Sequence, residues 1–270
     1  MGEPVIEALD LSRYGTVLVD LDGTAYIDGE ALPGVSAFMK RVRQGGHSVG
    51  FLTNMSFRSR EWCLDVLRRA DVDAKPDELV TAVDVMVELL VSQGVRSVAV
   101  IGSDEFRSEL CAAGFRVGNL AAGPMQNPDA LAVGMWPGVS EASIEAASRL
   151  ARDSVPVFAT SGVGSLPTAA GLVSGAAETV RRLRSVSGRP VTITGKPGQP
   201  FTDVVRRELD LVDPVLMIGD TMEVDIVMAD ANGWDSLLVL TGASDDPRDG
   251  ESQSLGGPTY VVRTLEDVDR

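Results

Sequence analysis

The stretch Val17-Leu-Val-Asp20-Leu-Asp22-Gly23-Thr24 decides how the rest of this chain is interpreted. It begins as a short apolar run typical of a buried strand and ends in two aspartates separated by one residue. Alternate residues of a strand point to the same face, so Asp20 and Asp22 are expected side by side. Gly23 permits a sharp turn that brings backbone N–H groups near an anion. Two adjacent carboxylates repel, which indicates a site for a cation or a shared proton.

Short runs rich in Val, Ile and Leu recur along the chain and alternate with segments of helical period. The expected strands are 16–21, 48–52, 97–101, 130–135, 155–159, 190–194, 214–218, 236–240 and 260–263, and the expected helices are 35–44, 59–69, 83–92, 141–152, 176–185 and 202–209. This alternation predicts an α/β fold with parallel sheets and right-handed crossovers. Ligands of such sheets bind beyond the carboxyl ends of the strands, so polar residues there are the candidate site.

Five further polar residues follow expected strands. Thr53 and Asn54 either donate to a phosphate or cap the next helix, and Lys196 offers a compact positive charge suited to phosphate. Asp220 stands at another strand tip. Asp225 falls early in the next helix, where it either coordinates a cation through water or serves the helix N-terminus. Carboxylate-rich sites with few soft ligands favour Mg²⁺, so the combination predicts a magnesium and phosphate site.

These stretches resemble the motifs of the haloacid dehalogenase superfamily of phosphohydrolases. The matching segments are Asp20–Thr24, Thr53-Asn54, Gly195-Lys196-Pro197, and Gly219-Asp220 with Asp225-Ile226. The long interval between the second and third motifs is similar to the C2-type cap insertion of the 4-nitrophenyl phosphatase, or NagD-like, branch. The resemblance implies a Rossmann-like parallel-sheet core of residues 1–77 and 194–270, and an inserted α/β cap of residues 78–193 that sets substrate specificity.

The same resemblance implies a reaction mechanism. Asp20 would attack phosphorus to form an aspartyl-phosphate, and Asp22 would act as the general acid and then the general base. The implied ligands of Mg²⁺ are Asp20, Asp220, the backbone carbonyl of Asp22, and Asp225 through a water. The implied phosphate-binding residues are Leu21, Asp22, Thr53, Asn54 and Lys196.

The chain departs from that branch where the cap and the second motif would face a leaving group. Met55 stands where the branch usually has a second Asn, and Trp136 stands where an Asp is common. Thr160-Ser161-Gly162-Val163 replaces a common Thr-Asn-x-Asp. We therefore expect Trp136, Ser161 and Val163 to form a less polar specificity surface. Trp136 would either line this pocket or pack in the cap core.

Composition narrows the classes of function. The chain has 270 residues and a formal net charge of −15, which argues against binding to nucleic acid or anionic lipid. Cys63 and Cys111 are expected to be buried free thiols, and with one histidine, His47, they cannot form a zinc site. We assign no function to His47 or to the acidic run 245–249. The chain has no apolar run of membrane-spanning length and no secretory leader, so a cytoplasmic location is expected.

The expected function is Mg²⁺-dependent hydrolysis of a small phosphate monoester, such as a sugar, glycerol or nucleotide phosphate. One alternative is a phosphatase dedicated to a single biosynthetic intermediate. Another is a non-catalytic protein that binds a phosphate ligand on the same fold, although the presence of both Asp20 and Asp22 favours turnover. Related caps often mediate dimers, which leaves a homo-oligomer such as a dimer open, because no feature of the sequence decides the oligomeric state.

Overall fold

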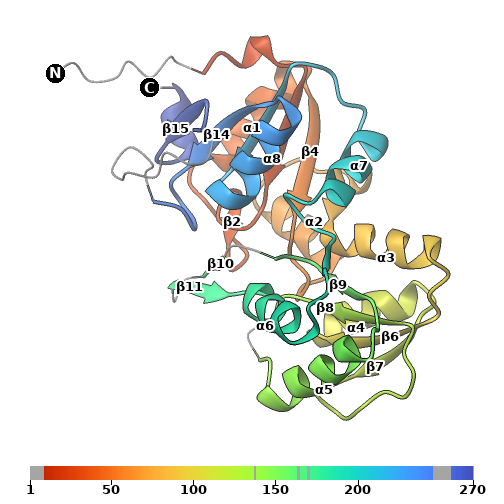
Figure 1. Ribbon diagram of the computed structural model, residues 1–270. Coiled ribbons are helices and arrows are strands. Elements are labelled where there is room, and N and C mark those ends of the chain that lie inside the picture. Colours follow the sequence, from red (N-terminus) through yellow and green to blue (C-terminus); the bar gives the residue numbers. More distant parts are fainter. Residues whose placement is uncertain (1–8, 137, 163–164, 169–170, 246–256, 270) are drawn as a thin grey trace.

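The computed structural model describes residues 9–136, 138–162, 165–168, 171–245 and 257–269 as two stacked α/β units (Figure 1). The upper unit in Figure 1, which we call the core, contains a six-stranded parallel sheet. Its strands are, in spatial order, β15 (Tyr260–Val262), β14 (Asp235–Val239), β13 (Val215–Gly219), β1 (Thr16–Asp20), β4 (Ser48–Thr53) and β5 (Leu79–Thr81). The central position of β1, between β13 and β4, places the end of the first motif in the middle of the sheet edge.

Both faces of the core sheet are covered by helices, which explains why its strands are apolar without alternation. Val17 and Val19 of β1 pack in the cluster that contains α1 (Val35–Gln44) and α2 (Arg60–Arg69). Leu18 points to the opposite cluster, with α7 (Gln199–Glu208) and α8 (Val227–Asn232). A short hairpin of β2 (Tyr26–Ile27) and β3 (Glu30–Ala31) follows β1.

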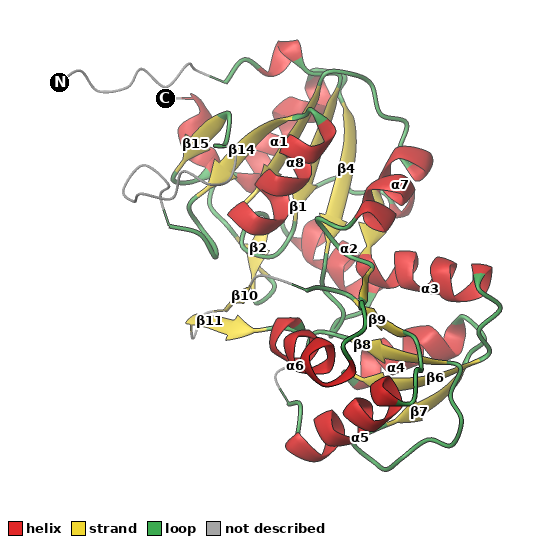
Figure 2. Cartoon of the chain, in the orientation of Figure 1, coloured by secondary structure: helices red, strands yellow, loops and turns green. Residues whose placement is uncertain are grey.

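The lower unit, the cap, has a second parallel sheet (Figure 2). Its strands are, in spatial order, β12 (Thr192–Ile193), β9 (Val157–Ala159), β8 (Ala130–Val133), β6 (Ser97–Ile101) and β7 (Arg116–Asn119). One face packs with α5 (Glu141–Arg152) and α6 (Ala177–Ser187), and the other with α3 (Ala82–Ser92) and α4 (Asp104–Ala112). A hairpin of β10 (Ser165–Thr168) and β11 (Gly171–Ser174) completes the cap. The predicted α/β architecture with an inserted α/β cap is confirmed.

The sequence patterns identified the long elements and missed the short ones. Every expected strand and helix is present, with ends that differ by up to three residues. The two hairpins, β5, β7 and α4 were not predicted, because runs of two to nine residues leave little periodicity to detect. The strand β5 pairs with β4 in the core sheet, although the predicted boundary assigns Leu79–Thr81 to the cap. The division of the chain into residues 1–77, 78–193 and 194–270 otherwise stays a prediction.

The two cysteines differ from the prediction in one respect. Cys63 is a buried free thiol as expected, but Cys111 is exposed. Phe106 and Leu110 face the cap core from α4, and Cys111 follows Leu110 by one residue, which turns its side chain away from that face. Among the described residues, no helix has the length and apolar character needed to cross a membrane.

Candidate active site

Three aspartates from distant parts of the chain meet at the carboxyl end of the core sheet. Asp20 ends β1, Asp220 follows β13, and Asp225 lies in the π-helical turn Met222–Ile226. All three are buried, and one carboxylate oxygen from each lies within 4.8 Å of the others. The pairing of β1 with β13 brings Asp20 beside the residues that lead into Asp220. The structure therefore confirms that these three predicted ligands form one cluster.

Lys196 inserts its ammonium group into this cluster. Its Nζ donates to Asp20 Oδ1 at 2.5 Å and to Asp225 Oδ1 at 2.8 Å, and it lies 3.4 Å from the backbone oxygen of Leu52. The side chain is only 1% exposed. One ammonium cannot balance three ionised carboxylates, so full ionisation of the cluster would leave a net negative charge in an enclosed place.

The cluster fits a divalent cation. The Oδ2 atom of Asp20 is buried and has no hydrogen-bond partner, although such atoms are normally satisfied. Asp220 Oδ2 accepts from the N–H of Ala243 at 2.5 Å, which fixes the direction of this carboxylate. A set of carboxylate oxygens without His or Cys is the donor set that Mg²⁺ prefers.

Asp22 lies beside this cluster on a tight turn. Backbone N–H groups of Ala25 and Tyr26 donate to the carbonyl of Leu21, and Gly23 adopts φ of +89°, which favours glycine. Thr53 Oγ1 donates to Asp22 Oδ2 at 3.2 Å and accepts from Met55 N–H at 2.9 Å. The second predicted motif is thus joined directly to the first.

The comparisons with known proteins agree with this geometry. Residues 17–116 match a model described as haloacid dehalogenase-like hydrolase, and residues 193–268 match a second HAD-hydrolase-like model. This chain is a haloacid dehalogenase-like hydrolase. An acid sugar phosphatase of Staphylococcus aureus is 26% identical over 261 residues, which cover 96% of this chain and 98% of that protein.

Two solved structures extend the likeness to the cap. The 4-nitrophenylphosphatase of Thermotoga maritima superposes with a TM-score of 0.80 at 25% identity, covering 96% of this chain and 98% of that one. A glycerol phosphate phosphatase of Mycobacterium tuberculosis in complex with magnesium gives a TM-score of 0.78 at 25% identity, covering 97% of this chain and 78% of that one. The expected enzyme class, a phosphatase of the 4-nitrophenyl phosphatase branch, is confirmed.

In this haloacid dehalogenase-like hydrolase, Asp22 is set up to carry a proton. Burial, followed by the nearby charge of Asp20, raises the pKa of Asp22 to about 8, while the Thr53 hydrogen bond and Lys196 oppose the rise. At neutral pH the carboxyl group of Asp22 therefore favours its protonated form. A carboxylic acid with a pKa near the working pH suits general acid and base catalysis.

The charges around Lys196 act in opposite directions. Burial alone would lower the pKa of Lys196, but Asp20 and Asp225 outweigh it and the net pKa is raised, so the side chain stays an ammonium. Burial raises the pKa of Asp225 to about 6 although Lys196 lowers it, and burial raises the pKa of Asp220 well above its usual value, helped by Asp20. Burial is the largest contribution to all three pKa values, and for Lys196 the two carboxylates reverse its effect.

The side chain of Asn54 makes a contact that was not predicted, and the binding of phosphate by Asn54 stays a prediction. Its side-chain amide was expected to bind phosphate, but Nδ2 donates to the carbonyl of Lys196 at 3.0 Å and Oδ1 accepts from the Lys196 N–H at 2.7 Å. The amide is therefore directed at the Lys196 backbone. Its proximity to the cluster, but not its orientation, followed from the sequence.

The predicted cap residues fall into three cases. Ser161 is buried and directly follows Thr160 at the end of β9. Trp136 is half-buried, and its indole lies against Gly138, where an added Cβ would come within 2.8 Å of the ring. Val163 lies outside the described residues, as does most of the acidic run 245–249.

Ser56 and Gly242 belong to the site although the sequence did not single them out. Ser56 Oγ accepts from the N–H of Met135 at 2.6 Å and lies 3.1 Å from Thr160 Oγ1, so a core hydroxyl joins the ends of two cap strands. Gly242 leaves room for Asp220, because an added Cβ would lie 1.9 Å from Asp220 Oδ2. The sequence offered only local indications of these two residues: Ser56 follows the second motif, and Gly242 follows an apolar strand.

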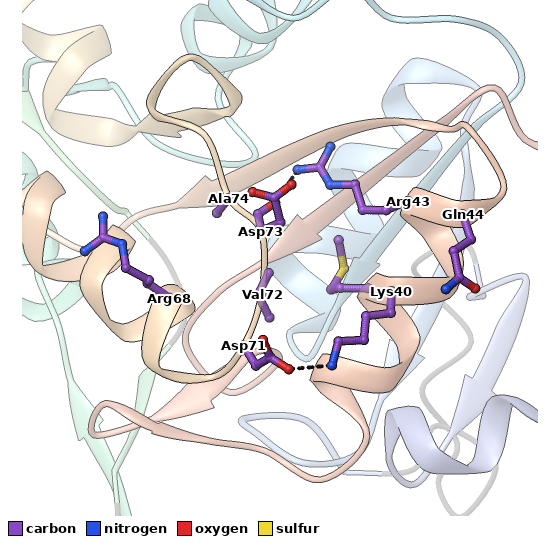
Figure 3. A pocket seen from close by; sticks show the side chains of 9 residues that line it. Lys40, Arg43, Gln44, Arg68, Asp71, Val72, Asp73 and Ala74 are labelled. Atoms are coloured by element: carbon purple, nitrogen blue, oxygen red, sulfur yellow. Dashed lines mark hydrogen bonds and ion pairs between the residues drawn. The ribbon is translucent and has the colours of Figure 1, made fainter.

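Two other hollows on the described surface lack this chemistry. A hollow of about 470 Å³ lies between α1 and the segment after α2, and Figure 3 shows Lys40, Arg43 and Arg68 around it. These cations are already engaged: Lys40 pairs with Asp71, Arg43 with Glu78, and Arg68 with Asp65. A larger, mainly acidic hollow of about 700 Å³ lies between α2 and the cap helices α3 and α4. Neither contains a carboxylate cluster paired with a buried lysine.

Proposed function

We propose that this phosphatase hydrolyses small phosphate monoesters in two steps, with Asp20 as the nucleophile and Asp22 as the acid and base. The observation that carries the proposal is the buried contact of Lys196 with Asp20 and Asp225, beside a third carboxylate and the protonatable Asp22. The arrangement combines a nucleophile, a proton donor and positive charge within one enclosed site.

In the first step, a carboxylate oxygen of Asp20 bonds to phosphorus while the bond from phosphorus to the ester oxygen breaks. Asp22 gives its proton to the departing alkoxide. In the second step, water attacks phosphorus, Asp22 takes a proton from that water, and inorganic phosphate leaves Asp20 free. Thr53 and Lys196 offer donors to the phosphoryl oxygens. Asp20, Asp220 and the backbone carbonyl of Asp22 would hold Mg²⁺, with Asp225 acting through a water, and the bound ion would supply positive charge that stabilises the phosphoryl oxygens.

The cap limits the size of the substrate. Met135 and Thr160 at the ends of two cap strands contact Ser56 of the second motif, so the cap meets the core beside the catalytic residues. We infer that small sugar or glycerol phosphates enter, as the names of the relatives suggest for those proteins. Trp136 and Ser161 are the candidate specificity residues on this side. A homo-oligomer stays open and the cytoplasmic location stays a prediction; gel filtration and cell fractionation test them.

The test is release of inorganic phosphate from a panel of sugar, glycerol and nucleotide phosphates and 4-nitrophenyl phosphate. Each ester is assayed with Mg²⁺, with EDTA, and with the Asp20→Asn variant. We expect release in Mg²⁺ that falls to background with EDTA and in Asp20→Asn, while the variant keeps its fold by circular dichroism. Release from one ester alone would favour the dedicated phosphatase. Equal release by Asp20→Asn and wild type would refute the nucleophile assignment.

A further inference from the structure

The amide side chain of Asn54 makes two hydrogen bonds to one residue that lies 142 positions away in the sequence. It accepts from the N–H and donates to the C=O of Lys196, which are the two polar groups of that residue's backbone. With 2.7 and 3.0 Å, both bonds have ordinary hydrogen-bond lengths. A side-chain amide used in this way replaces the backbone pairing that a strand would provide, and it fixes both the place and the direction of the peptide groups around Lys196.

Gly195 is shaped for this contact. A Cβ at Gly195 would lie 2.3 Å from Asn54 Oδ1 and 2.1 Å from the backbone oxygen of Thr160. Gly195 thus lies between the Asn54 side chain of the core and the Thr160 backbone at the end of a cap strand, where no side chain larger than hydrogen fits. The clamp on Lys196 and the glycine beside it are parts of one arrangement.

Lys196 needs such a clamp because of where it lies in the chain. It belongs to the segment that leaves the cap at β12 and enters the core at α7. Two residues before it, Thr194 lies at the junction of cap and core. Its hydroxyl donates at 2.9 Å to the carbonyl of Ala82, a residue of the core cluster, and its N–H donates at 2.8 Å to the carbonyl of Ala159 in cap strand β9. The two bonds from Asn54 tie the backbone of Lys196 to the core at this junction.

The residues of the second motif and Ser56, which follows it, each contact a different part of the protein. Thr53 contacts Asp22, Asn54 contacts the Lys196 backbone, and Ser56 contacts the cap through Met135. Asn54 lies at the end of β4, a central strand of the core sheet, so it is anchored to the same sheet as Asp20. The core therefore holds both the nucleophile and the backbone of the lysine that contacts it.

We propose that Asn54 is a positioning residue: its side-chain amide fixes the Lys196 backbone to the core, so that the ammonium stays in contact with Asp20. This inference rests on the proposed function for its kinetic consequence, and on the geometry alone for its structural one. It differs from the sequence-based expectation, in which the amide itself binds phosphate.

The test compares Asn54→Ala and Asn54→Asp with wild type by hydrogen exchange in the peptide that contains Lys196. Alanine removes both bonds, whereas aspartate retains an acceptor for the Lys196 N–H. We expect the Lys196 amide to exchange about tenfold faster or more in Asn54→Ala, and to stay closer to wild type in Asn54→Asp. Asn119→Ala serves as the control, because Asn119 caps a local turn in the cap through the N–H of Ala121. Unchanged exchange at Lys196 in Asn54→Ala would overturn the proposal.

Kinetics supply the second readout. A displacement of about 1 Å at a catalytic group costs up to about 100-fold, so we expect kcat of Asn54→Ala to fall about 10- to 100-fold. In a Lys196→Ala background the same change should cost less than about twofold, because no ammonium is left to position. An equal loss in both backgrounds would show direct action of Asn54 on phosphate and would overturn the proposal.

The two tests separate the proposal from the proposed function. If wild type releases no phosphate from any ester, the proposed function fails. The exchange measurement needs no turnover, so it still decides whether Asn54 holds Lys196, including where Lys196→Ala is too slow to assay.

Discussion

Replacing Gly242 by alanine should damage the metal site without unfolding the protein. The new Cβ would lie 1.9 Å from Asp220 Oδ2 and 2.4 Å from its Cγ. Ordinary contact between carbon and oxygen requires roughly 3.4 Å, so the carboxylate has to retreat by about 1.5 Å. The same movement breaks its hydrogen bond from the N–H of Ala243. Overpacking of this kind costs about 1–3 kcal/mol, which a domain of this size tolerates.

The expected loss concerns magnesium more than stability. Mg²⁺ requires ligand distances of about 2.1 Å and near-ideal octahedral geometry. A carboxylate displaced by about 1.5 Å therefore no longer coordinates the ion. Changes to groups that orient a metal ligand typically cost about 10- to 100-fold in affinity or activity, and we expect a loss of that size. The assay is a titration of Mg²⁺ by calorimetry together with phosphate release at each concentration.

The control for this prediction is Gly257→Ala, because an added Cβ there meets no atom of the described residues within 4 Å. Gly257→Ala should bind Mg²⁺ as wild type does. If Gly242→Ala retained wild-type affinity for Mg²⁺, Asp220 would not be a metal ligand held in place by this glycine. If both variants lost affinity equally, the close approach of Gly242 to Asp220 would not be the cause.

Two further predictions concern the contact between cap and core. Ser56→Ala leaves the buried N–H of Met135 without its acceptor, so the free energy of unfolding measured in urea should fall by about 1–3 kcal/mol. The control Ser108→Ala, on the exposed surface, should change this free energy little. Equal losses in both variants would refute the stabilising role of the buried Ser56 hydroxyl. Burial, with help from the charge of Asp84, raises the pKa of Glu109 from 4.5 to about 7. The folded state therefore binds the carboxyl proton of Glu109 more tightly than the unfolded state does, and the free energy of unfolding should fall as the pH rises from 4.5 to about 7. Glu109→Gln should flatten the pH profile of the melting temperature, and a profile identical to wild type would contradict the shift.

Much of this site could be predicted from local sequence, because most of its functional residues lie in short segments directly after strands. The spacing of Asp20 and Asp22 after an apolar strand places both at the sheet edge, since alternate strand residues share a face. The polar ends of three further strands identify Thr53, Lys196 and Asp220 in the same way, because parallel strands present their carboxyl ends at one edge. The structure then brings all of these residues together.

Side-chain direction and close approach between distant segments followed only from the tertiary structure. The contact of the Asn54 amide with the Lys196 backbone could not be predicted from the sequence, because the two residues lie 142 positions apart. Gly219 precedes Asp220 at the end of β13 and Gly242 follows β14, but only the structure shows that they leave space for the carboxylates of Asp225 and Asp220. A sequence records which groups are available, but not which of several distant partners each one reaches.

The sequence by itself determined the two-sided burial of the strands, the helices between them, and the set of charged groups at the strand ends, because these depend on period and spacing within a few residues. Only the tertiary structure decided that β1 lies between β13 and β4, and that Lys196 reaches Asp20 across 176 positions. Strand order depends on how helices pack across both faces of the sheet, and that packing is a property of the whole chain.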